Sequence, residues 1–105
     1  MIDPTEAERA LDWLTRNADM HATLVGQLRR AEDGVKKIEA LLIKGMDNQG
    51  TPVTLRQAHA RADERYQQAL DVATGAKIDL VKNEDLMDAA KIRISLYQTQ
   101  VKDRM

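Results

Sequence analysis

The sequence contains no cysteine and no phenylalanine, and aromatic residues make up only 3% of it. Without cysteine it has no disulfide, no thiolate nucleophile and no cysteine-based zinc site. Alanine is the commonest apolar residue. Because small side chains bury little area each, a core formed by a single pair of helices would be thin. The composition therefore favours oligomerisation, with a homodimer as the first expectation.

The chain also lacks an excess of charge, with 16 basic and 17 acidic residues and a formal net charge of −1. Such a chain has no whole-molecule field to attract nucleic acid or an anionic membrane, although a local basic patch stays open. No apolar run approaches the roughly 18 residues of a membrane span. The opening MIDPTEAERALDW carries acids where a secretory signal carries Lys or Arg. We expect a cytoplasmic protein with a single helical domain over 1–105.

Pro4 is followed by a long stretch without proline, which predicts one helix over about 4–45. Asp3 suits the N-cap of this helix, and Pro4 suits its first position. Glu6 stands where a capping box needs an acid. Gly45, next to a lysine, is typical of a helix end.

Apolar residues recur along this helix at alternating spacings of three and four, which is a heptad seam and favours left-handed supercoiling against a partner. Asn17 and His21 are its polar members. We interpret them as a polar layer that sets the register between helices. For His21 a proton carrier or metal ligand is the alternative. The seam consists of Ala7, Ala10, Leu14, Asn17, His21, Leu24, Leu28, Ala31, Val35, Ile38 and Leu42.

The run MDNQGT predicts a turn after the first helix. Pro52 at a first helical position predicts a short helix over about 52–61. Thr54 and Gln57 offer that helix a capping box. A break is expected near Ala62.

The last helix is expected over about 63–103, beginning at a candidate cap, Asp63. Its seam has the same spacing, and Asn83 is the one polar member. The seam consists of Ala69, Ala73, Ala76, Leu80, Asn83, Met87, Ala90, Ile94, Tyr97 and Val101.

A second apolar stripe lies beside that seam. On the first helix Leu11 widens the apolar face, and Trp13 lies toward its edge. The stripe consists of Ile78, Val81, Ala89, Ile92 and Leu96. One two-helix hairpin cannot cover both stripes, so a dimer that forms a helical bundle is expected. The predicted fold is an all-α, antiparallel, coiled-coil-like hairpin of long helices with a short helix in the connection. The predicted interaction residues are Leu14, Asn17, His21, Leu24, Leu28, Leu80, Asn83, Met87, Ile92, Ile94, Leu96 and Tyr97.

Two groups of polar residues resemble chemical sites only loosely. His59 and Asp63 form an i, i+4 pair, which helix geometry also produces by chance. Glu84, Asp85 and Asp88 cluster carboxylates, but all-α nucleotide hydrolases that bind magnesium need spaced acid pairs on two helices, and only Asp85 and Asp88 have that spacing. We expect a solvated acidic face. The sequence predicts no catalytic, cofactor-binding or metal-binding residue, and no enzyme.

Basic residues load the second half of the first helix, namely Arg29, Arg30, Lys36 and Lys37. They are candidate nucleic-acid contacts. Acidic residues interleave with them at helical spacing, as in the pair Glu32 and Lys36, and aromatic stacking partners are missing nearby. A solvated face is the favoured interpretation.

The closing run LMDAAKIRISLYQTQVKDRM resembles the C-terminal helix of small phage and prophage proteins, which reads like E-x-A-R-L-R-I-E-x-W-R-S-L-x-A-N-R. Ala90, Ile92 and Ile94 stand in similar places. Tyr97 is offset from the usual Trp, and D-R replaces the closing N-R. The opening EAERALDWLTRNAD resembles the group's A-L-D-Y-L-x-x-T start, with Trp13 in the Tyr place. The middle segments AHA and RYQ are similar to its A-x-A and E-Y-Q.

This resemblance implies an accessory or adaptor role among phage replication and recombination proteins, or inhibition of a host enzyme, through helix–helix contacts with a phage or host protein. It transfers no functional residue. Direct nucleic-acid binding through the basic half of the first helix is the alternative.

Overall fold

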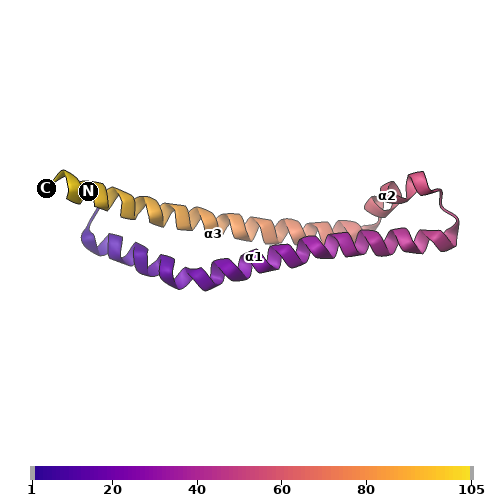
Figure 1. The fold of residues 1–105 in the computed structure, drawn as a ribbon, viewed down its shortest axis with the longest axis horizontal. Coiled ribbons are helices and arrows are strands. Elements are labelled where there is room, and N and C mark those ends of the chain that lie inside the picture. The colour runs from indigo at the N-terminus through magenta and orange to yellow at the C-terminus, as the bar shows by residue number, and fades with distance from the viewer. Residues whose placement is uncertain (1, 105) are drawn as a thin grey trace. The chain divides into compact units, whose positions relative to one another are not determined.

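The computed structural model describes residues 2–104, and these form an all-α helical hairpin without strands (Figure 1). Helix α1 spans Pro4–Met46, α2 spans Val53–Ala62 and α3 spans Glu64–Asp103. A short 3-10 turn, Asp47–Gln49, follows α1. The fold class is therefore the one that the sequence predicts, with the short helix in the connection.

Asp3 begins α1 in the way that its sequence indicates. Its side-chain Oδ1 accepts a hydrogen bond from the backbone N of Thr5 at 2.9 Å. Its carbonyl accepts bonds from the amides of Glu6 at 3.0 Å and Ala7 at 3.2 Å. Pro4 is the first helical residue, where a missing N–H costs nothing.

The end of α1 differs from the prediction. The helix passes through Gly45 and ends at Met46, and the left-handed glycine is Gly50, with φ of 71°. The amide of Thr51 then bonds back to the carbonyl of Met46 at 3.4 Å. The reason is that Asp47–Gln49 continues a right-handed helical turn, so the chain reverses only where glycine relieves the steric cost.

The start of α2 also differs from the prediction, which made Pro52 the first helical residue. Pro52 is the residue before the helix rather than its first residue, and no side chain caps this end in the described chain. Gln57, expected in a capping box, instead donates from Nε2 to Glu39 Oε1 at 3.3 Å. Arg61 Nε donates to Glu39 Oε2 at 3.1 Å. These bonds, first Gln57 and then Arg61, lower the pKa of Glu39 and tie α2 to α1.

The predicted break lies at Asp63, directly after Ala62, where the backbone is extended with ψ of 139°. Asp63 Oδ1 accepts a hydrogen bond from the amide of Arg65 at 2.8 Å, and the Arg65 guanidinium also binds this carboxylate. The Arg65 contacts, side chain first, lower the pKa of Asp63. Because Asp63 is extended and paired with Arg65, the i, i+4 pair with His59 does not form within residues 2–104.

Backbone contacts divide the chain into two compact units. The terminal unit comprises Met1–Leu24 and Asp79–Met105, and the turn unit comprises Val25–Ile78. In the terminal unit the start of α1 and the end of α3 lie antiparallel (Figure 1). The amide of Ile2 donates to Gln100 Oε1 at 3.2 Å. The turn unit contains the rest of α1, α2 and the start of α3. A single domain stays a prediction.

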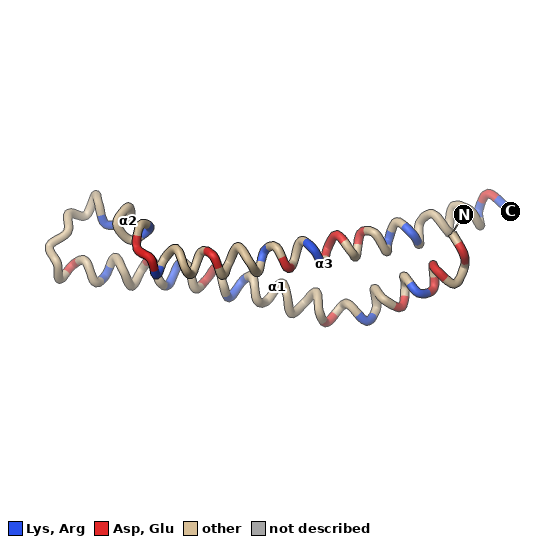
Figure 2. Tube along the Cα trace, turned by 180° about the vertical axis from the view of Figure 1, so that it is seen from behind, with Lys and Arg blue, Asp and Glu red and all other residues tan. Residues whose placement is uncertain are grey.

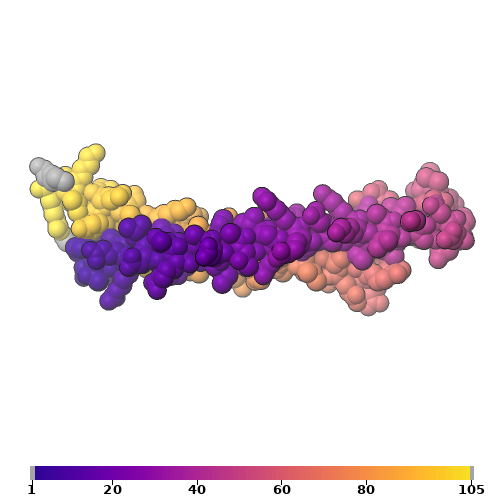
Figure 3. All heavy atoms as spheres, turned by 60° about the horizontal axis from the view of Figure 1, so that its bottom comes forward, coloured from indigo at the N-terminus to yellow at the C-terminus, as the bar shows by residue number. Residues whose placement is uncertain are grey.

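Every position of the two predicted seams is buried or half-buried. The buried apolar residues are mostly alanines, and no large side chain among residues 2–104 is fully buried. Atoms of α1 cover most of the face turned to the viewer in Figure 3. Each unit therefore has a thin core formed by small side chains, with Ala60 of α2 completely buried in the turn unit.

Candidate interaction surfaces

The polar residues of the seams lie inside the terminal unit. Asn17 is 9% exposed, and its Nδ2 has no hydrogen-bond partner within residues 2–104. Asn83 Nδ2 donates to Met87 Sδ at 3.6 Å. His21 Nε2 lies 3.4 Å from Glu84 Oε2. Asn17 therefore has an unmet buried amide, which costs about 1–3 kcal/mol.

The acidic cluster lies on the same side of the terminal unit as His21. Glu84, Asp85 and Asp88 are exposed and line, with His21, a groove of about 400 Å³. In the described part of the chain, no group of three or more His, Cys, Asp or Glu side chains is placed to hold a metal ion. The pairing of His21 with Glu84 was missed from the sequence, because 63 residues separate the two.

Most predicted interaction residues lie within the hairpin itself. All of them except Ile92 and Leu96 are buried or half-buried seam positions. Ile92 is 59% exposed and Leu96 is 50% exposed. While the hairpin is closed, the seam residues hold α1 against α3, and Ile92 and Leu96 stay available to a partner.

These two residues belong to an apolar face on α3 in the terminal unit. The predicted position of these residues, in a stripe beside the seam, is wrong. At about 100° per residue, Val81, Ala89, Ile92 and Leu96 fall on the side of the helix opposite the seam. Val81 is 41% exposed. Asp85, seven residues before Ile92, falls on the same side. We call Val81, Ala89, Ile92 and Leu96 the outer α3 face.

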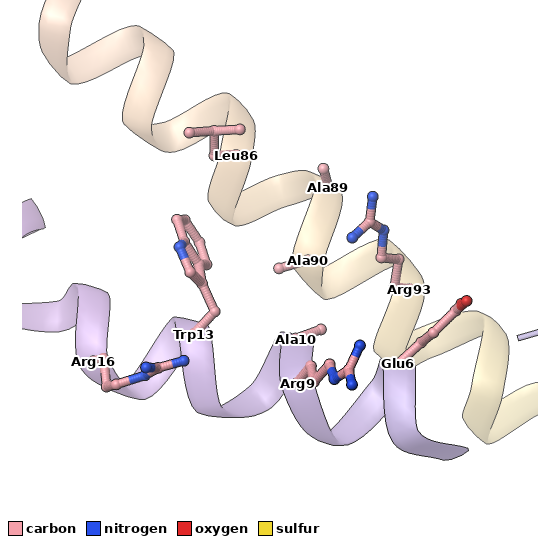
Figure 4. A pocket seen from close by; sticks show the side chains of 9 residues that line it. All are labelled: Glu6, Arg9, Ala10, Trp13, Arg16, Leu86, Ala89, Ala90 and Arg93. Carbon is pink, nitrogen blue, oxygen red and sulfur yellow. The ribbon is translucent and has the colours of Figure 1, made fainter. Parts of the chain in front are cut away.

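A second surface of the terminal unit is a groove of about 670 Å³ between α1 and α3 (Figure 4). Trp13 reaches from α1 toward α3, where it meets Leu86 and Ala90, and the groove also carries three arginines. We call it the arginine groove, and its arginines are Arg9, Arg16 and Arg93. The sequence placed Trp13 at the edge of an apolar face but did not single out the arginines. The available signal was their spacing, since Arg9 and Arg16 lie one heptad apart.

The predicted nucleic-acid contacts lie in the turn unit. Arg29, Arg30, Lys36 and Lys37 are all exposed. Arg29 and Lys36 are seven residues apart, as are Arg30 and Lys37, so the four residues form two rows along α1 about 100° apart. The ion pair expected between Glu32 and Lys36 does not form within residues 2–104. Along both long helices basic and acidic positions are interspersed (Figure 2).

Comparison with protein families, curated proteins and solved structures finds no match to this chain. The resemblance to small phage proteins therefore stays a prediction. Among residues 2–104, no helix is sufficiently long and apolar to span a membrane.

Proposed function

We propose that the chain is a cytoplasmic accessory or adaptor protein of phage type that self-associates through the outer α3 face and acts by binding other proteins, without an active site. One observation carries this proposal. The seams already close against each other within each unit, yet Val81, Ile92 and Leu96 remain between 41% and 59% exposed. Ala89, Ile92 and Leu96 follow one another at i, i+3 and i+4 spacing on α3 and are therefore neighbours on its surface. Exposed apolar surface of this kind marks interaction sites in soluble proteins.

The accessible surface supports a partner of substantial size. The chain exposes 7888 Å², whereas a globular monomer of its mass exposes about 5900 Å². The excess of roughly 2000 Å² per chain is larger than the area of about 800 Å² that each partner contributes to a standard interface. A second copy that contributes the same surface by two-fold symmetry is the simplest partner.

The geometry of α3 suits a contact centred on Ile92 and Leu96. Asp85 lies seven residues from Ile92, about 10 Å along the helix. A contact centred on Ile92 therefore leaves this carboxylate at the rim, where water still solvates it. Ala89 between them allows close approach of a second helix because its side chain is small.

The self-association test compares two variants at several protein concentrations by light scattering. Ile92→Glu with Leu96→Glu is expected to give a monomer of unchanged helicity, because a charge inside the contact loses its solvation. Leu41→Glu is the matched control. Leu41 is 65% exposed but lies in the turn unit, so the dimer should persist. A wild-type chain that stays monomeric at all concentrations contradicts this proposal.

The accessory role has its own test, since the resemblance to phage proteins is its only support. Capture with the tagged chain from phage-infected cells is expected to return a recombinase, a nuclease or a single-strand binding protein. The interaction must then be reproduced with the purified partner. An eluate without any replication or recombination protein contradicts the role.

Direct nucleic-acid binding is the second candidate, favoured by four cations on α1 in the turn unit that form no ion pair within residues 2–104. Single-stranded and duplex DNA should then bind at about 50 mM salt, where electrostatic binding is strong, and dissociate as salt rises. Arg29→Glu with Arg30→Glu should abolish the binding. The absence of binding by the wild-type chain at that salt concentration removes this candidate.

A further inference from the structure

We propose that the arginine groove binds an acidic amphipathic helix of a partner protein, with a bulky apolar side chain of that helix inserted between α1 and α3. This inference extends the proposed function by naming the chemistry of the partner. It does not require self-association, because Trp13 and the three arginines lie outside the outer α3 face, with which the groove shares only Ala89.

The floor of the groove is apolar and made largely of small residues. Ala10 and Ala90 are 6% and 7% exposed, and Trp13 is half-buried beside them. Leu86 at the wall is 59% exposed. Because the alanines occupy little volume, the groove has about 670 Å³ for a leucine-sized or aromatic anchor of a partner. Helix recognition in an apolar groove uses anchors of this kind.

The rim of the groove is positively charged on both helices. Arg9 and Arg16 come from α1 and Arg93 comes from α3 (Figure 4). None of them forms an ion pair within residues 2–104. Arg16 Nε instead donates to the carbonyl of Asp12 at 3.4 Å. One carboxylate, Glu6, also lines the groove, so the rim keeps an excess of positive charge.

The spacing of these cations fits a helix that carries acids. Arg9 and Arg16 are seven residues apart, about 10 Å along α1. A helix that lies along the groove presents carboxylates at the same interval when its acids recur every seven residues. Guanidinium groups bind carboxylates through paired hydrogen bonds. The charge and the apolar floor therefore select the same ligand, an acidic helix with apolar anchors.

A nucleic acid fits this groove less well. The indole of Trp13 is half-buried and reaches toward Ala90 (Figure 4), whereas single-strand binding needs an aromatic face open for a base. Leu86 offers an apolar wall that phosphates and sugars do not use.

The groove contains its own reporter, since Trp13 is the single tryptophan of the chain. The probe is a tryptophan-free peptide of about three heptads, with leucine at the a and d positions and glutamate elsewhere. On the full chain it is expected to shift Trp13 emission to shorter wavelength and to reduce quenching by acrylamide. Binding should weaken as salt rises. The same peptide with lysine in place of glutamate should have no effect.

Two paired variants locate the binding. Arg9→Glu with Arg16→Glu is expected to lower the affinity for the glutamate peptide by at least about tenfold, since two attractive contacts become repulsive. Arg29→Glu with Arg30→Glu makes the same charge change in the turn unit and should leave the affinity within about twofold. Circular dichroism establishes that each variant folds. If the glutamate variant loses helicity, Arg9→Gln with Arg16→Gln replaces it.

Several outcomes overturn the inference. Equal binding of the lysine peptide, or no response to the glutamate peptide, removes the acidic helix as ligand. A larger Trp13 response to an oligo-dT strand points to a nucleic acid instead. Trp13 emission that changes with protein concentration alone assigns the groove to a second copy. Light scattering on the same samples separates this result from the proposed dimer, which Arg9→Glu with Arg16→Glu should leave intact.

Discussion

Replacing Asn17 with leucine is expected to stabilise the protein, although it removes a polar residue from the seam. Asn17 is 9% exposed, and its Nδ2 has no hydrogen-bond partner within residues 2–104. An unsatisfied buried amide costs about 1–3 kcal/mol. Leucine has a similar size and adds apolar burial at the same position. We expect the free energy of unfolding to rise by about 1–3 kcal/mol, or roughly 4–8 °C in melting temperature for each kcal/mol.

The assay is urea unfolding followed by circular dichroism, at one protein concentration for all variants. Asn83→Leu is the matched control, because Asn83 is 8% exposed but its amide already donates to Met87 Sδ. Its gain should be smaller than that of Asn17→Leu. The oligomeric state is measured in parallel, since a buried asparagine also sets register and partner number in coiled coils.

A fall of about 1 kcal/mol or more in the free energy of unfolding of Asn17→Leu would contradict this expectation. That result would mean that the Asn17 amide has a partner in solution, from a buried water or from a second copy. A gain for Asn83→Leu equal to that for Asn17→Leu would show that the bond to Met87 contributes nothing.

Four further predictions concern the turn unit. Gly34→Ala should add up to about 1 kcal/mol of stability, since glycine is a poor helix former and nothing lies within 4 Å of the added Cβ. Gly50→Ala should instead cost about 1–2 kcal/mol, because Gly50 has φ of 71°; equal melting temperatures for the two variants would contradict both assignments. Ala60→Leu should lower stability by about 1–3 kcal/mol through overpacking, as Ala60 is 0% exposed, and an unchanged urea midpoint would show that α2 moves away at little cost. The contacts with Arg65 lower the pKa of Asp63, so their stabilisation is present above about pH 4 and disappears as pH falls through the lowered pKa. The difference in urea midpoint between the wild type and Asp63→Asn should therefore shrink between about pH 5 and pH 2, and a constant difference would refute this role of Asp63.

Local features of the chain were readable from the sequence. The cap at Asp3 and the break next to Ala62 depend on residues within a few positions of each other, so the sequence contains the whole signal. The seams were readable because burial on a helix repeats with its turn. The wrong predictions at the end of α1 and the start of α2 also concern residues close together in the sequence. Gly45 and Gly50 both suit a helix end, and only the backbone shows which of them turns left-handed.

The contacts between helices needed the tertiary structure. His21 meets Glu84 across 63 residues, and Gln57 meets Glu39 across 18. Sequence periodicity shows which side of a helix is buried, but it leaves open which residue lies opposite which on the partner helix. That register depends on how side chains distant in the sequence pack together.

The arginine groove likewise depends partly on the sequence and partly on the tertiary structure. The heptad spacing places Arg9 and Arg16 on one side of α1, and this much is present in the sequence. Only the packing of α3 against α1 adds Arg93, Leu86 and a buried alanine floor to the same groove. The periodicity of the chain determined two amphipathic helices, and the register between them decided which charges and apolar side chains meet at one surface. The physical reason is that helix formation is local, whereas a binding surface is assembled from segments that only tertiary packing brings together.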